Sequence, residues 1–146
     1  MPADLTDREH WETAIVRSAG RFFMLAVLAE QPRHGYDIAK RITELCGGCC
    51  APSDAMIYPA IRDLTEAGLV HCETQSSGGR QRNVCALTAQ GEQALSVAAQ
   101  AWGAHLPALQ RVVELASSGD VAAFADGALC CAPEPDLITP AQITRA

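Results

Sequence analysis

Five cysteines in two clusters are the residues of this chain with the clearest capacity for chemistry. Three fall within a Gly-rich stretch of five positions, and two are adjacent near the C-terminus. Cysteine thiolates are soft ligands that select zinc, cadmium, mercury or trivalent arsenic. The clusters therefore predict a site for a soft metal or metalloid ion, as one site or two, on Cys46, Cys49, Cys50, Cys130 and Cys131. The alternative for the first cluster is three small residues in a tight turn.

Apart from the metal site, the cysteines predict neither an enzyme nor a disulfide framework. The chain has seven cysteines, an odd number, and a reducing compartment disfavours disulfides. Cys72 and Cys85 fall on predicted strands, where we expect them to pack against the core. No motif that would place a thiol beside a general base in a pocket is visible, so we predict that the chain is not an enzyme. A metal-carrying or thiol redox protein is the alternative from another class.

The segment from Ser53 to Leu69 has the features of a DNA-reading helix. Its first residue is a favourable N-cap, and Ile57, Ile61 and Leu64 share one apolar face. Gly68 is the expected C-terminal stop. A two-stranded ribbon around a Gly-rich turn follows, as in a winged helix-turn-helix whose recognition helix enters the major groove.

If this helix enters the groove, its N-terminal half faces base edges, and the arginines of the ribbon reach phosphates or the minor groove. The predicted DNA contacts are Tyr36, Lys40, Ser53, Asp54, Met56, Tyr58, Arg62, Arg80 and Arg82. The alternative is that these are solvated surface groups.

Further helices and strands are expected on both sides of the segment from Ser53 to Leu69. The pattern predicts helices over 1–20, 22–30 and 34–45, strands over 69–75 and 80–87 around a turn at 76–79, and a long helix from Thr88. We expect Thr6 to cap the first helix and Gly20 to allow a turn after it. In the long helix, apolar residues recur at spacings of three, four and seven, which favours a dimer interface. That seam comprises Leu95, Trp102, Leu106, Leu109 and Val113.

The sequence therefore predicts four parts: an N-terminal helical arm (1–20), a winged helix-turn-helix domain (21–87), C-terminal dimerisation helices (88–131) and a flexible tail (132–146).

The net charge of −6 argues against a general nucleic-acid binder, so any DNA-binding face must be local. No apolar run is long enough to cross a membrane, and the acidic N-terminus is unlike a secretory signal. We therefore expect a cytoplasmic protein without a membrane partner.

Three segments resemble the PadR family of transcriptional regulators, namely FFMLAVLAEQPRHGYDIAKRI (22–42), SDAMIYPAIRDLTEAGLV (53–70) and ALTAQGEQAL (86–95). The resemblance implies a mostly α fold with a small β-wing, a winged helix-turn-helix plus a long C-terminal dimerisation helix. It also implies a homodimer that leaves double-stranded operator DNA when an effector binds. The cysteine clusters depart from the family pattern, whose usual inducers are phenolics and hydrophobic drugs.

Together these features predict a homodimeric DNA-binding transcriptional repressor whose operator affinity is controlled by a thiophilic metal or metalloid. An ion drawing Cys46, Cys49 and Cys50 together would reposition Ser53 and the DNA-reading face. Two alternatives keep the repressor. One assigns a hydrophobic or phenolic inducer near Trp102, and the other makes thiol oxidation the signal.

Overall fold

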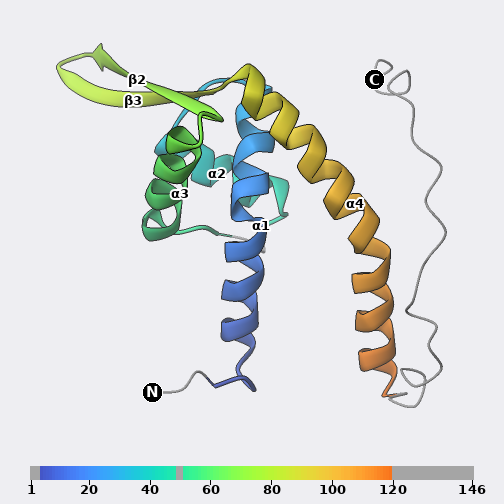
Figure 1. Cartoon of the computed structure of the whole chain (residues 1–146). Coiled ribbons are helices and arrows are strands. Elements are labelled where there is room, and N and C mark those ends of the chain that lie inside the picture. The colour runs from blue at the N-terminus through green and yellow to red at the C-terminus, as the bar shows by residue number, and fades with distance from the viewer. Residues whose placement is uncertain (1–3, 49–50, 120–146) are drawn as a thin grey trace. The chain divides into compact units, whose positions relative to one another are not determined.

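A computed structural model describes residues 4–48 and 51–119 of the chain (Figure 1). The elements, in order, are α1 (Arg8–Glu30), β1 (Arg33–His34), α2 (Gly35–Leu45), α3 (Asp54–Glu66), β2 (Val70–Ser77), β3 (Arg80–Leu87) and α4 (Ala89–Ser118). The strands form one antiparallel sheet in the order β1-β3-β2. This mostly helical fold with a small wing and a long C-terminal helix confirms the predicted fold class.

The chain divides into two compact units, Met1–Ala98 and Ala99–Ala146. In the first unit, apolar faces of the first three helices pack together with the foot of the sheet. The fully buried side chains of largest volume are Met24, Val27, Ile38, Ile42 and Cys85.

Helix α1 has no break after residue 20, where the sequence analysis predicted one. It is one continuous helix from Arg8 to Glu30, because an internal glycine costs only about 1 kcal/mol relative to alanine and buried residues on both sides of Gly20 hold the helix together. The cap is also different. Asp7, and not Thr6, occupies the N-cap and accepts a hydrogen bond from the Glu9 amide, whereas the Thr6 hydroxyl donates to Asp4.

Helix α3 ends where the sequence predicts, by a mechanism that explains the glycine. Gly68 adopts a φ of 75°, its amide donates to the Thr65 carbonyl, and the Leu69 amide donates to the Leu64 carbonyl. This Schellman motif requires the left-handed conformation that glycine adopts at no steric cost. Ser53 is the N-cap residue, but its side chain makes no capping hydrogen bond. The helix continues through Pro59.

The pairing of the two wing strands joins Cys72 and Cys85, which the sequence analysis did not predict. β2 and β3 pair from Val70–Leu87 to Ser77–Arg80, so the turn contains only Gly78 and Gly79. This register sets Cys72 directly opposite Cys85, with their Cα atoms 4.0 Å apart, and the two are joined by a disulfide. The expectation that both cysteines pack against the core is confirmed, since Cys85 is buried in the core and Cys72 packs against it. The argument against disulfides is wrong for this pair.

The start of α4 is anchored to the foot of the wing. The Thr88 hydroxyl donates to the Gly68 carbonyl and accepts from the Gly91 amide, so it caps the long helix that the sequence predicts from this residue. From there α4 runs without interruption to Ser118. None of the helices within residues 4–48 and 51–119 has both the length and the apolar character that a membrane crossing demands.

Candidate nucleic-acid interface

A groove of about 890 Å³ runs between the start of α2, one flank of α3 and the wing. Four of the residues predicted to contact DNA line it, namely Tyr36, Tyr58, Arg62 and Arg82. Both tyrosines are largely exposed, at 74% and 58%. The fold therefore brings two aromatic rings and two guanidinium groups from three separate elements to one surface.

Gly35, the first residue of α2, positions one of these rings. A Cβ built on Gly35 would lie 3.2 Å from the Tyr58 ring carbon Cε1 and 3.4 Å from its hydroxyl. The ring thus rests against the backbone at the start of α2. This contact joins the His34-Gly35-Tyr36 segment to the Tyr58-Pro59 step of α3.

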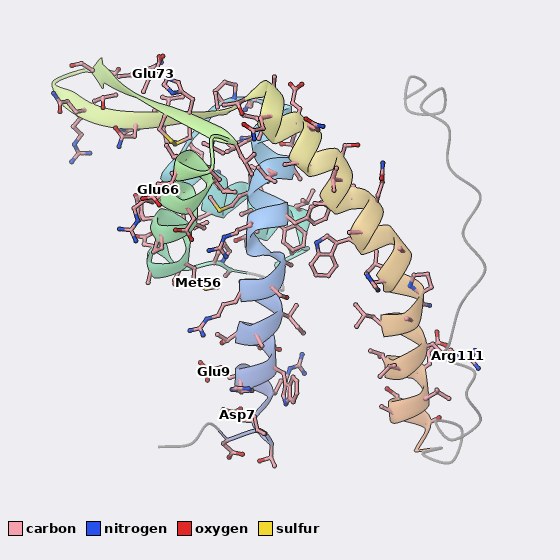
Figure 2. All side chains as sticks on the ribbon, in the orientation of Figure 1. Asp7, Glu9, Met56, Glu66, Glu73 and Arg111 are labelled. Carbon is pink, nitrogen blue, oxygen red and sulfur yellow. A yellow bond between two sulfur atoms is a disulfide. The ribbon has the colours of Figure 1, made fainter. Side chains whose placement is uncertain are left out.

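The two flanks of α3 have different neighbours. Tyr58, Arg62 and Thr65 lie on the flank that lines the groove. Ser53 and Met56 instead line a second cavity, of about 560 Å³, on the α1 side of the helix, and Figure 2 labels Met56 near the N-terminal end of α3. The predicted base-reading set is therefore divided between two surfaces.

Asp54 is exposed in the first turn of α3 and lines neither cavity. Lys40 is exposed on α2, one turn after Tyr36. Arg80 and Arg82 occupy alternate positions on β3 and so share one face of the ribbon. Both are exposed, and they pair across the ladder with Ser77 and Gln75.

The basic residues of the first unit divide into two sets. Arg21 forms an ion pair with Asp63 that joins α1 to α3. Arg33 and Arg41 both donate to Glu30. By contrast, the described residues contain no ion-pair partner for Arg17 of α1, nor for Lys40 of α2, Arg62 in the groove, and Arg80 and Arg82 on the wing.

The Glu30 cluster fixes the end of α1 to α2. Arg41 donates to both carboxylate oxygens of Glu30, at 2.9 Å each, and also pairs with Glu44 at 3.3 Å. These hydrogen bonds, with a further one from Arg33, hold the pKa of Glu30 below its usual range. The same contacts raise the pKa of Arg41. Neither Arg33 nor Arg41 is therefore available to a phosphate without breaking this cluster.

Of the predicted metal ligands, the structure describes only Cys46. It is the C-cap of α2, is half-buried and packs against the core. Hydrogen bonds from the Gly47 and Gly48 amides to the carbonyls of Glu44 and Thr43 end the helix around it. Cys49, Cys50, Cys130 and Cys131 lie outside the described residues. Among the residues that are described, no three His, Cys, Asp or Glu side chains gather closely enough to hold an ion.

The predicted dimer seam is mostly exposed along α4. Leu106, Leu109 and Val113 are 52–63% exposed, and Trp102 is half-buried. Leu95 differs from these residues because it packs against the core of its own chain.

Comparison with known proteins identifies the family. The model of the transcriptional regulator PadR-like family matches residues 24–97. Transcriptional regulator YqjI of Escherichia coli (strain K12) is 36% identical over 73 residues, which cover 50% of this chain and 34% of that protein. The chain thus spans about a third of the length of the curated relatives it matches.

Solved structures show the same fold. A transcriptional regulator from Clostridium thermocellum aligns with a TM-score of 0.62 at 17% identity, over 67% of this chain and 96% of that one. A PadR family transcription regulator from hypervirulent Clostridium difficile R20291 aligns with a TM-score of 0.57 at 20% identity, over 65% and 98%. Because the family model covers half of the chain, this protein belongs to the PadR-like family of transcriptional regulators.

Proposed function

We propose that this protein is a homodimeric transcriptional repressor that binds double-stranded operator DNA through α3 and the wing. The observation that carries the proposal is the convergence of Tyr36, Tyr58, Arg62 and Arg82 on one groove. Exposed arginines without a carboxylate partner bind phosphate at the least cost, and the exposed tyrosines supply adaptable polar and apolar contacts. Family membership supports the same assignment.

The experiment measures binding to the DNA upstream of the protein's own gene as a function of salt. Each lost phosphate contact lowers the slope of log affinity against log salt by about 0.9. We expect Arg62→Ala and Arg82→Ala each to lower it by about that amount. Arg111→Ala, which removes an equal charge from an exposed position on α4, is the control. If all three variants behave alike, the groove is not the DNA-binding surface.

Dimerisation through α4 is the second part of the proposal. Leu106, Leu109 and Val113 lie on one stripe of the helix and are more than half exposed, which favours burial against a second copy. We expect Leu109→Glu to yield a monomer in analytical ultracentrifugation. Val97→Glu is the matched control, because Val97 is 60% exposed but lies off the stripe. A dimer that survives Leu109→Glu would exclude this seam as the interface.

Control by a thiophilic ion is the third part. Cys46 ends α2, and the segment that carries Cys49 and Cys50 leads directly to Ser53 at the start of α3. An ion bound by these thiolates, with or without Cys130 and Cys131, would constrain the connection that sets the position of α3. A coupling free energy of about 1–3 kcal/mol corresponds to a loss of DNA affinity of about 5- to 150-fold.

This part is tested by adding zinc, cadmium, mercury or trivalent arsenic to the complex of reduced protein and DNA. We expect one of these ions to release the DNA from the parent protein. Cys49→Ser and Cys50→Ser should bind DNA normally and fail to release it. If the ions release these variants as readily as the parent, the loop thiols are not the sensor.

A further inference from the structure

Cys72 and Cys85 form the only covalent link between the two strands of the wing within the described residues. Cys85 is buried in the core at 2% exposure, whereas Cys72 is half-buried and lies 3.9 Å from the Thr65 hydroxyl of α3. Both cysteines line the groove that contains Tyr58 and Arg82. The link therefore lies at the foot of the wing, between the core and the strand positions that carry the wing arginines.

Beyond this link and the two-residue turn at Gly78-Gly79, no packed apolar side chains hold the register of the outer wing. The four outermost cross-strand pairs, from Thr74–Asn83 to Ser77–Arg80, contain only polar residues, and all are exposed. Among them the described side chains make one hydrogen bond across the ladder, from the Thr74 hydroxyl to Asn83 at 2.9 Å. A two-stranded ribbon that is polar on both faces is marginally stable and weakly specified in register.

We propose that Cys72 and Cys85 are a thiol–disulfide exchange site, and that the state of this link sets the affinity of the wing for DNA. The second half of the proposal rests on the proposed function. With the link formed, Arg80 and Arg82 are held in the observed register, opposite Ser77 and Gln75, before DNA arrives. With the link reduced, binding must first order the outer wing, and that ordering lowers the net affinity.

The reaction partner is a low-molecular-weight disulfide. The more accessible Cys72 thiolate attacks one sulfur of that disulfide, which breaks its S–S bond, forms a mixed disulfide and releases one small thiolate. The Cys85 thiolate then attacks the Cys72 sulfur, forms the cross-strand link and releases the second small thiolate. Overall, two protein thiols and one small disulfide become one protein disulfide and two small thiols, and excess small thiol reverses the sequence.

The test uses the full chain with the other five cysteines changed to alanine, so that only this pair can react. The protein is equilibrated in buffers of defined reduced and oxidised glutathione, then alkylated and weighed by mass spectrometry. DNA affinity is measured in each buffer across a range of salt. We expect the linked form to bind more tightly, with a salt slope steeper by up to about 1.8, the value for two phosphate contacts. The same chain with Cys72→Ala and Cys85→Ala is the control and should not respond to glutathione.

Two results overturn the proposal. One is a pair that stays reduced in oxidising buffer, and the other is a linked form whose DNA affinity and salt slope equal those of the reduced form. If neither form binds DNA, the proposed function fails, and deuterium exchange of residues 73–83 then decides the wing proposal, which is overturned if linkage does not slow exchange. If the five-alanine chain does not fold, peptide mapping of the parent protein locates the link and the same measurements follow.

Discussion

Replacing Gly91 with alanine tests how the long helix is joined to the wing. Gly91 is buried in the first turn of α4, and a Cβ at this position would lie 2.1 Å from the Leu69 carbonyl oxygen and 2.7 Å from a methyl carbon of Leu87. The carbonyl oxygen is not free to move, because it accepts a hydrogen bond from the Thr88 amide at 3.0 Å. Alanine must therefore displace backbone rather than a flexible side chain.

The cost can be estimated from two contributions. Overpacking a closely packed site typically costs about 1–3 kcal/mol, and loss of an N-cap costs about 1 kcal/mol. Because the shift separates Thr88 from both Gly68 and Gly91, we add the two and expect Gly91→Ala to be destabilised by about 2–4 kcal/mol. For a chain of this size that corresponds to a fall in the thermal midpoint of roughly 5–15 °C.

The assay is thermal unfolding at one fixed protein concentration, with Gly20→Ala as the matched control. Gly20 also lies inside a helix, but no atom lies within 4 Å of a Cβ built on it. Alanine at that position should stabilise the protein by about 0.5–1 kcal/mol, since it gains helix propensity without a clash. If Gly91→Ala melts within about 2 °C of the parent protein, the packing described at the α4 junction is wrong.

Two further predictions concern the Glu30 cluster and the groove. Because hydrogen bonds from Arg41 hold the pKa of Glu30 below its ordinary value of 4.5, the carboxylate stabilises the fold above that value and loses this effect as the pH falls through the lowered pKa. The thermal midpoint of Glu30→Gln should therefore decline less in acid than that of the parent, while Glu66→Gln, which alters an exposed carboxylate, should follow the parent curve. Gly35→Ala should displace the Tyr58 ring and weaken DNA binding while the thermal midpoint changes by less than about 2 °C, and unchanged binding would show that the ring position is unimportant.

Local signals in the sequence predicted much of the first unit. The helix stop at Gly68 and the start of the long helix at Thr88 depend on residues within a few positions, and both occur as expected. The break expected at Gly20 did not occur. A single glycine is a weak signal there, because the packing of distant residues against the flanking turns outweighs its conformational cost.

The disulfide was missed for a reason that can be traced to the turn. A four-residue turn over 76–79 would place Cys72 opposite Asn83, whereas the observed two-residue turn at Gly78-Gly79 places it opposite Cys85. Two-residue hairpin turns strongly favour residues that accept positive φ, and both glycines have it, at 58° and 79°. The Gly-Gly pair was thus the signal that fixed the register. Because the predicted turn was two residues longer than the observed one, Cys72 was not expected to face Cys85, and the disulfide was not predicted.

The net charge of −6 was the strongest sequence argument against DNA binding, and the ion pairs show why a residue count misleads. Over residues 33–82 the acidic and basic side chains are equal in number, which predicts a weak local field. Yet Arg33 and Arg41 are both held by Glu30, a residue outside that range, and Asp63 is occupied by Arg21 of α1. The ion pairs that neutralise these arginines therefore lie among α1, α2 and the flank of α3 that faces α1. The cations that remain unpaired within the described residues of α2, α3 and β3 are those beside the groove and on the wing. The groove is lined by Asp37 and Glu66 as well as by Arg62 and Arg82, so it offers individual unpaired arginines and not an excess of basic residues. The pairing pattern, rather than the total charge of the chain, decides where those arginines lie.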